Sequence, residues 1–331
     1  MTIDAPPTGE PGHAPDVVVF VEETLGNAAA IKHAEKIAHA LGGHVSIAHV
    51  MVPPHQAASP VDPVDWDISK QETHGWLAGL SHTLDASGRE TKVQLLEGQC
   101  INQIMSYMAD RQGDVAAAIR SRAAGRWRLS DTVCGVLESR STAILVIPED
   151  APLPETRRYQ KILVPLDGSA RAESALPIAA TLARADGAEL LLCYVAPQPG
   201  LSEFGMLDRD AAKLSTQVQK RNTLAGQTHL TKVKNSLAHH GLNVSTRIIT
   251  DGDARRSLMA TVEHESVDFL VMATHGQSGH RDVPVGDVAS FILGRADVPV
   301  LMVRNDGGRS DASAFLGVAS EGVRQPSGTD R

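Results

Sequence analysis

VVVFVEET at residues 17–24 aligns without a gap with ILVPLDGS at residues 162–169, at an offset of 145 positions (162 − 17). Further along the chain, Asp114 aligns with Asp268, so the similarity continues well beyond these first segments. A repeat of this length indicates a duplicated domain, because the units of solenoid proteins repeat about every 20–50 residues. The sequence therefore predicts two copies of one folding unit.

Each copy alternates strand-like and helix-like segments. The first segment of each copy is a continuous apolar run, which is typical of a strand buried on both faces of a parallel sheet. Apolar residues then recur at helical spacing over residues 28–41 and, as one helix, over residues 172–183. The alternation continues through five strands and predicts an α/β fold: two tandem Rossmann-like open parallel five-stranded sheets with helices on both faces.

The repeat also sets the expected domain boundaries. We expect residues 1–15 to be a disordered N-terminus and residues 16–150 to form domain 1. Residues 151–158 are then a linker, residues 159–305 form domain 2, and residues 306–331, rich in Gly, Ser and Asp, are a disordered tail.

Composition excludes several classes of partner. The chain of 331 residues has a net charge of −8 and no basic stripe, so we expect no nucleic acid, whose phosphates need clustered Lys and Arg. Its three cysteines are widely spaced, which favours reduced thiols over a zinc site. No stretch approaches the roughly 18 apolar residues of a membrane span, and the first 15 residues lack a signal-peptide core. We therefore expect no membrane association and a cytoplasmic protein.

The segment best suited to binding chemistry lies between the fourth strand and the last helix of copy two. It reads MATHGQSG at residues 272–279 and continues as VGDVA at residues 285–289, with nine residues between Gly276 and Gly286. Glycines let a backbone approach a ligand closely, and the N–H groups of a loop that opens a helix attract anions. The segment is therefore a candidate phosphate-binding loop.

This arrangement resembles the universal stress protein family, whose nucleotide-binding members carry Gly-x2-Gly-x9-Gly-Ser/Thr. The resemblance also rests on residues 164–169 (VPLDGS), on Asp251-Gly252 and on residues 298–303 (VPVLMV). It implies a stress-adaptation regulator that binds an adenine nucleotide, ATP first, with or without Mg²⁺, in its C-terminal domain and without substantial turnover. The alternatives are a nucleotide-free interaction scaffold and a slow ATPase.

The resemblance implies a nucleotide site but neither catalytic residues nor metal ligands. Asp167 would accept a hydrogen bond from the ribose or adenine, Val195 would flank the base, and the glycine loop would surround the phosphates. The full implied set is Pro165, Leu166, Asp167, Val195, Met272, Ala273, Thr274, His275, Gly276, Gly279, Gly286, Asp287 and Val288.

Two residues depart from the family pattern. Ala273 replaces the first glycine, and Asp287 replaces the hydroxyl residue that follows the last glycine. A carboxylate about 4 Å from a phosphate charge costs about 4 kcal/mol at an effective dielectric of about 20, unless Mg²⁺ bridges the two. Two interpretations stay open: a working nucleotide site, or an empty remnant in which Asp287 is the N-cap of the last helix.

Copy one lacks the glycine loop. Arg122 stands at the position of Gly276, and Ser130 stands at that of Gly286, so we expect a closed pocket in a degenerate partner domain. The resemblance further implies that residues 143–147 and 300–303, the fifth strands, pair antiparallel within the chain, giving a pseudo-symmetric pairing of the domains. A homodimer is expected as an additional level of assembly.

Overall fold

The structure of the protein is a computed structural model. It describes residues 14–53, 62–85, 91–111, 113–121, 129–139, 141–152, 158–198, 209–250, 252–276 and 285–304. Most of the expected disordered N-terminus and all of the expected disordered tail lie outside these described residues.

The two halves of the chain contain the same succession of elements, except that the second half has two helices, α5 and α6, where the first half has α1. The first half contains β1 (Val17–Phe20), α1 (Asn27–Leu41), β2 (Val45–Met51), α2 (Pro63–Asp85), β3 (Lys92–Glu97), α3 (Cys100–Ala109), β4 (Val115–Arg120), α4 (Asp131–Glu138) and β5 (Ala143–Pro148). The second half contains β6 (Lys161–Pro165), α5 (Ala170–Glu173), α6 (Leu176–Asp186), β7 (Glu189–Val195), α7 (Arg209–Ala238), β8 (Val244–Ile249), α8 (Ala254–His264), β9 (Phe269–Ala273), α9 (Asp287–Leu293) and β10 (Val300–Val303).

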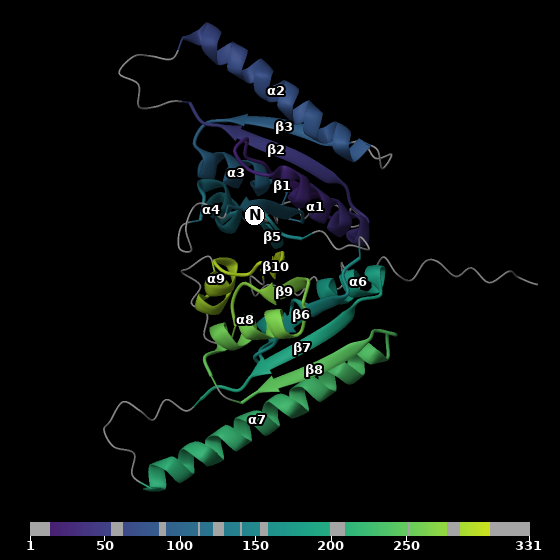
Figure 1. The fold of residues 1–331 in the computed structure, drawn as a ribbon, viewed down its shortest axis with the longest axis vertical. Coiled ribbons are helices and arrows are strands. Elements are labelled where there is room, and N and C mark those ends of the chain that lie inside the picture. The colour runs from purple at the N-terminus through teal and green to yellow at the C-terminus, as the bar shows by residue number, and fades with distance from the viewer. Residues whose placement is uncertain are drawn as a thin grey trace, which may run out of the picture.

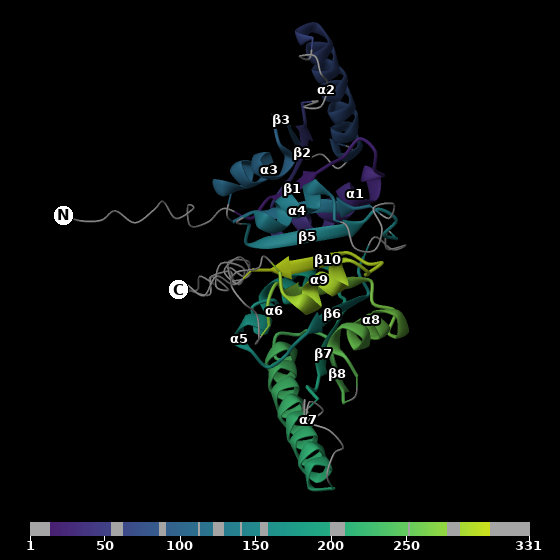
Figure 2. The ribbon, with the colours of Figure 1, turned by 90° about the vertical axis from the view of Figure 1, so that its left-hand side faces the viewer.

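The strands of both halves form one sheet, in the order β3-β2-β1-β4-β5-β10-β9-β6-β7-β8. Within each half, neighbouring strands are parallel. The predicted α/β fold with parallel strands is thus confirmed. Where the halves meet, β5 and β10 pair antiparallel, with Val300 opposite Val146 and Val303 opposite Ala143. Figure 2 shows these two strands side by side in the middle of the molecule. The carboxyl ends of the two sets of parallel strands therefore lie at opposite edges of the sheet.

Helices cover both faces of this sheet (Figure 1). One core contains buried apolar side chains from α1, α2, α6 and α7, and the other contains those from α3, α4, α8 and α9. The strand β1, in the middle of the first half, is fully buried, as its continuous apolar run predicts. Among the described residues, no helix combines the length and apolar character needed to cross a bilayer.

The single helix that spacing predicts over residues 172–183 is wrong in one respect. The structure divides it into α5 and α6, with Ser174 and Ala175 between them. Pro177 lies in the first turn of α6, where its missing N–H leaves no donor unsatisfied. The same ring cannot continue an earlier helix without a clash, so the chain restarts its helix at Leu176.

Arginine side chains join the two halves beside the antiparallel pair. Arg120, the last residue of β4, donates to the Gly294 carbonyl after α9 at 3.2 Å. Arg304, which follows β10, donates to the Leu137 carbonyl of α4 at 2.6 Å. Each cation thus meets carbonyls at the C-terminal end of a helix in the other half, where the helix dipole favours positive charge.

A second contact joins α1 of the first half to the start of the second half. His33 Nδ1 lies 2.8 Å from the Tyr159 hydroxyl, and both side chains are buried. Beside them, Lys36 forms an ion pair with Asp186 at 2.7 Å. Because these residues come from both halves, the packing of one half depends on the other.

Candidate nucleotide site

The carboxyl ends of β6, β7 and β9 lie at one edge of the second half's sheet. β6 pairs in parallel with β7 on one side and with β9 on the other, so the strand order reverses beside β6. Ligands of open α/β sheets bind beyond the strand ends at such a switch point. Three groups of predicted residues belong to this edge: Asp167 after β6, Val195 at the end of β7, and residues 274–276 after β9.

The Asp167 carboxylate is held in place by the turn that follows β6. Its Oδ1 accepts hydrogen bonds from the Ser169 amide at 2.9 Å and from the Ser169 hydroxyl at 2.6 Å. Between them, Gly168 has a φ of +83°, a backbone conformation that residues other than glycine rarely adopt. Ser169 is also the N-cap of α5, since its Oγ accepts from the Ala172 amide at 3.1 Å. One short turn therefore orients a carboxylate and begins a helix.

Gly276 lies directly against Asp167. A Cβ added to Gly276 would be 2.3 Å from Asp167 Oδ2, far inside van der Waals contact. Any side chain there would have to displace the carboxylate or the loop. The glycine at this position is therefore explained by the close approach of two segments that follow neighbouring strands.

Thr274 connects the end of β9 to the start of α9. Its amide donates to the Val303 carbonyl at 2.9 Å, and its carbonyl accepts from the Gly286 amide at 2.8 Å. A Cβ on Gly286 would be 3.2 Å from the same carbonyl, so glycine suits this position too. The His275 ring lies beside them, with Nδ1 at 3.2 Å from Thr274 Oγ1. The two ends of the loop thus meet, although Gly279 lies outside the described residues.

Asp287 is paired with an arginine that the sequence did not single out. Its Oδ2 accepts from Arg255 Nη1 at 3.0 Å, and its side chain is 83% exposed. Arg255 also holds Asp253 through Nε and Nη2. Hydrogen bonding from the Arg255 side chain is the main reason that the pKa of Asp253 is lowered. The carboxylate that would repel a phosphate therefore shares a cation with a second carboxylate.

The interpretation of Asp287 as the N-cap of the last helix is wrong. Gly286 occupies the N-cap position of α9 and makes no side-chain capping bond, while Asp287 is the first residue of the helix. The physical reason is that Gly286 has the extended backbone of an N-cap (φ −67°, ψ 164°), while its carbonyl already accepts the first helical hydrogen bond, from the Ser290 amide at 2.9 Å.

The other predicted residues differ in how deeply their side chains are buried. Leu166, Met272 and Ala273 are buried in the core, so a ligand beyond the strand ends would meet their backbone and not their side chains. Val195 and Val288 are partly buried against the core on the face covered by α8 and α9. Pro165 is the last residue of β6 and is half-buried.

Ser169 and Arg255 complete the site but were missed in the sequence. Both have a local signal in a helix start: Ser169 is itself the N-cap of α5, and Arg255 lies in the first turn of α8, after the N-cap Asp253. Tyr194 was also missed. Burial raises the pKa of its hydroxyl, and the negative charge of Asp167 raises that pKa further.

The first half has a polar contact at the equivalent position. Glu22 stands where Asp167 stands, and its Oε1 accepts from the Ser130 hydroxyl at 2.9 Å. Ser130 is the N-cap of α4 and accepts from the Val133 amide at 3.3 Å. Arg122, which was expected to close this pocket, lies outside the described residues. The described contact joins the segment after β1 to the start of α4, which are the first-half counterparts of the segments that contain Asp167 and Gly286.

The described residues also bear on metal binding. Within the described ranges, no group of three or more His, Cys, Asp or Glu side chains is arranged to hold a metal ion.

Comparisons with known proteins match the second half by sequence and most of the chain by fold. Residues 158–304 match the model of the Universal stress protein family. A universal stress protein of Methanocaldococcus jannaschii is 29% identical over 147 residues, which cover 44% of this chain and 82% of that protein. The crystal structure of a universal stress protein from Archaeoglobus fulgidus covers 88% of this chain and 97% of its own, with a TM-score of 0.63 and 17% identity. At that identity the likeness shows a shared fold. A universal stress protein in complex with cAMP is 22% identical, covers 44% of this chain and 97% of its own, and has a TM-score of 0.33.

Proposed function

Because this chain belongs to the universal stress protein family through residues 158–304, we propose that its C-terminal half binds an adenine nucleotide, with ATP preferred. The single observation that carries the proposal is the contact between Asp167 and Gly276 at the switch point of the sheet. It brings a fixed hydrogen-bond acceptor and the glycine loop together at the edge where α/β sheets bind ligands.

The proposed binding mode divides the nucleotide between two groups of residues. Asp167, oriented by Ser169, accepts from the ribose hydroxyls or the adenine amine, and Val195 lies beside the base. The backbone around Gly276 and Gly286 lies along the phosphates, because neither glycine carries a side chain that would keep them away.

Charge at the phosphate end favours binding more than the sequence suggests. Asp287 alone would repel a phosphate, but Arg255 lies 3.0 Å from it and offsets part of its charge, although the same cation also pairs with Asp253. We propose that the protein acts in stress adaptation by changing its interactions when the nucleotide is bound, and not through rapid hydrolysis.

The experiment tests occupancy and then affinity. Purified protein is denatured and the supernatant is analysed for adenine nucleotide by chromatography. Isothermal titration calorimetry then measures ATP, ADP, AMP and cAMP, each with and without Mg²⁺. We expect bound nucleotide or a measurable Kd for ATP, and we expect Gly276→Arg to abolish binding because its side chain meets Asp167.

Gly79→Arg is the matched control, because a Cβ at Gly79 has no atom within 4 Å and the residue lies on α2 in the other half. It should bind ATP as the wild type does. Absence of released nucleotide together with no heat of ATP binding by the wild type, with or without Mg²⁺, would overturn the proposal.

A further inference from the structure

A groove in the first half is independent of the candidate nucleotide site. It has a volume of about 650 Å³ and lies where β1 and β2 end against α2. Because β5 and β10 are antiparallel, this groove and the nucleotide site lie at opposite edges of the sheet. The groove is lined by Glu23, His49, Val50, Met51, Val52, Ser69, Glu72, Thr73 and Trp76.

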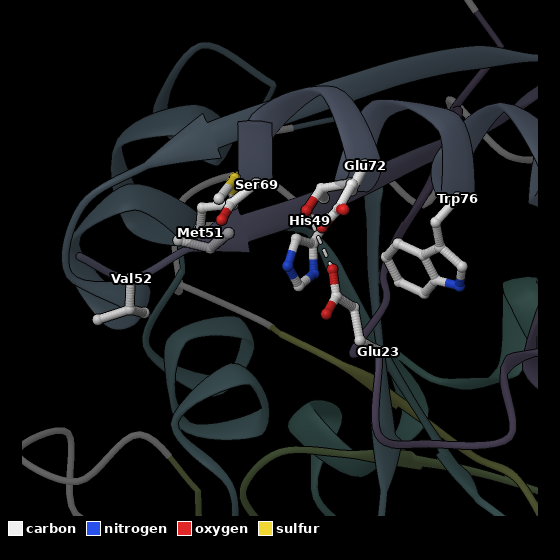
Figure 3. Close-up of a pocket in the computed structure, with 9 residues that line it drawn as sticks. Glu23, His49, Met51, Val52, Ser69, Glu72 and Trp76 are labelled. Atoms are coloured by element: carbon white, nitrogen blue, oxygen red, sulfur yellow. Dashed lines mark hydrogen bonds between the residues drawn. The ribbon is translucent and has the colours of Figure 1, made fainter. Parts of the chain in front are cut away.

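Among the described residues that line it, the groove has two carboxylates, those of Glu23 and Glu72, and no lysine or arginine. Figure 3 shows both carboxylates and the His49 ring pointing toward one another. Lys70, on the same helix as Glu72, pairs instead with Glu97, its Nζ 2.9 Å from Oε2. The groove therefore has a negative potential that the described cation on α2 does not cancel.

Two neighbours hold Glu23 and His49 in place. Glu23 Oε1 accepts from the buried Thr73 hydroxyl at 3.1 Å. His49 Nδ1 lies 2.7 Å from the Val21 carbonyl oxygen, and a carbonyl only accepts, so Nδ1 carries a proton. In the neutral ring, Nε2 is then an acceptor. The groove consequently offers acceptors from two oriented side chains.

Trp76 adds an aromatic wall. Its ring meets the His49 ring edge to face, with centroids 5.3 Å apart at 83°. Cations are attracted to the electron-rich face of an indole, and the methylenes of an alkyl chain pack against Trp76 and the valines of the groove. Carboxylates, a nitrogen acceptor and an aromatic face together match an ammonium group on a short carbon chain.

The aligned positions of the second half explain why this groove differs from a nucleotide site. Glu23 aligns with Gly168, and His49 aligns with Tyr194, at the offset of 145 that relates the two copies. A second carboxylate thus follows Glu22 in the first half, where the second half has a glycine. Carboxylates repel phosphates and attract protonated amines. The sheet edge of the first half therefore suits a cationic ligand, whereas that of the second half suits an anionic one.

We propose that this groove binds a small organic cation that bears protonated primary amines on an alkyl chain. The probe is putrescine (1,4-diaminobutane), measured by isothermal titration calorimetry, with 1,4-butanediol and succinate as neutral and anionic probes of the same length. Putrescine should bind, its affinity should fall as salt is added, and the other two probes should give no heat.

Glu72→Gln tests the contact directly. Glu72 is exposed, and the described part of the chain gives it no hydrogen-bond or ion-pair partner, so the variant should fold normally. Losing one charge-assisted hydrogen bond should weaken putrescine binding about tenfold. The control Asp67→Asn removes one charge from the exposed surface of the same helix, outside the groove, and should bind as the wild type does.

Three results would overturn the proposal: no putrescine binding to the wild type at millimolar concentration, equal weakening by the two variants, or binding of 1,4-butanediol as tight as that of putrescine. Gly276→Arg should leave putrescine affinity unchanged, so failure of nucleotide binding and failure of amine binding are separate outcomes.

Discussion

At the residue scale, the candidate site depends on contacts between positions far apart in the chain. Gly276 touches Asp167 although 109 positions separate them (276 − 167). Asp287 is paired with Arg255, 32 positions earlier. Gly276 and Gly286 are explained by the lack of space for a side chain at each position. The charged residues, in contrast, have to be considered together. Arg255 lies between two carboxylates, so the field at the loop is set by all three residues.

Substitutions of Arg255 and Asp287 should change ATP affinity in opposite directions. Arg255→Gln leaves Asp287 unpaired, so ATP binding should weaken by about fivefold, the size expected of an exposed ion pair. Asp287→Ser should tighten binding by a similar factor. Calorimetry at low and high salt measures both effects, which salt should reduce.

Arg256→Gln is the control for Arg255→Gln, because it removes the same charge from the adjacent exposed residue. If the two variants weaken ATP binding equally, the effect comes from net charge and not from the Arg255–Asp287 pair.

At the scale of elements, the short turn after β6 both orients a residue of the candidate site and begins a helix. The Asp167–Ser169 turn ends β6, orients a carboxylate and begins α5. Its left-handed Gly168 permits the sharp change of direction. The four-residue α5 then stops before Pro177, and α6 restarts the chain on the face of the sheet. Since helices this short have little intrinsic stability, the serine cap is a large part of what fixes the turn.

Ser169→Ala should lower the free energy of unfolding by about 1 kcal/mol, the usual loss of an N-cap. It should also weaken ATP binding, because Asp167 loses a hydrogen-bond donor. Ser169→Thr keeps the hydroxyl and should restore most of both quantities. Urea denaturation followed by circular dichroism gives the stability, and calorimetry gives the affinity. Equal stability of Ser169→Ala and the wild type would contradict the capping role.

At the scale of the whole molecule, the duplication produces one continuous sheet with the two long helices α2 and α7 at opposite ends (Figure 1). The β5–β10 pairing and the reciprocal arginine contacts join the halves. His33 lies at a second junction, against Tyr159, and its burial lowers its pKa from 6.5 to about 4. A homodimer stays a prediction, and it would need a surface other than β5 and β10, which already pair within the chain.

Stability should therefore decrease as pH falls below about 6.5. The unfolded chain takes up a proton on His33 near its ordinary pKa, whereas the folded chain resists it until about pH 4, so the unfolded state binds more protons in this window. Between pH 7 and pH 5 the loss from this residue should be about 2 kcal/mol.

Urea denaturation at pH 7 and pH 5 measures that difference. His33→Gln should remove most of this pH dependence, while His74→Gln, at an exposed residue of α2, should retain it. A wild type and a His33→Gln variant with the same pH dependence would show that His33 is not its source.

Periodicity and the internal repeat were enough to predict the fold, because the apolar runs of β1 and β6 and the helical spacing of α1 belong to local stretches of chain. They failed at Pro177, where one ring divides a helix. The residues after β6 and β9 were also predictable, since parallel strands bring their carboxyl ends to one edge.

The sequence by itself determined the duplication, the parallel α/β halves and the loss of the glycine loop from copy one. Only the tertiary structure decided that Asp287 is paired with Arg255, that Ser130 meets Glu22, and that the other edge has an acidic groove beside Trp76. The reason is physical: hydrophobic periodicity is written along the chain, whereas the field at a site is summed over side chains that folding brings together from distant positions.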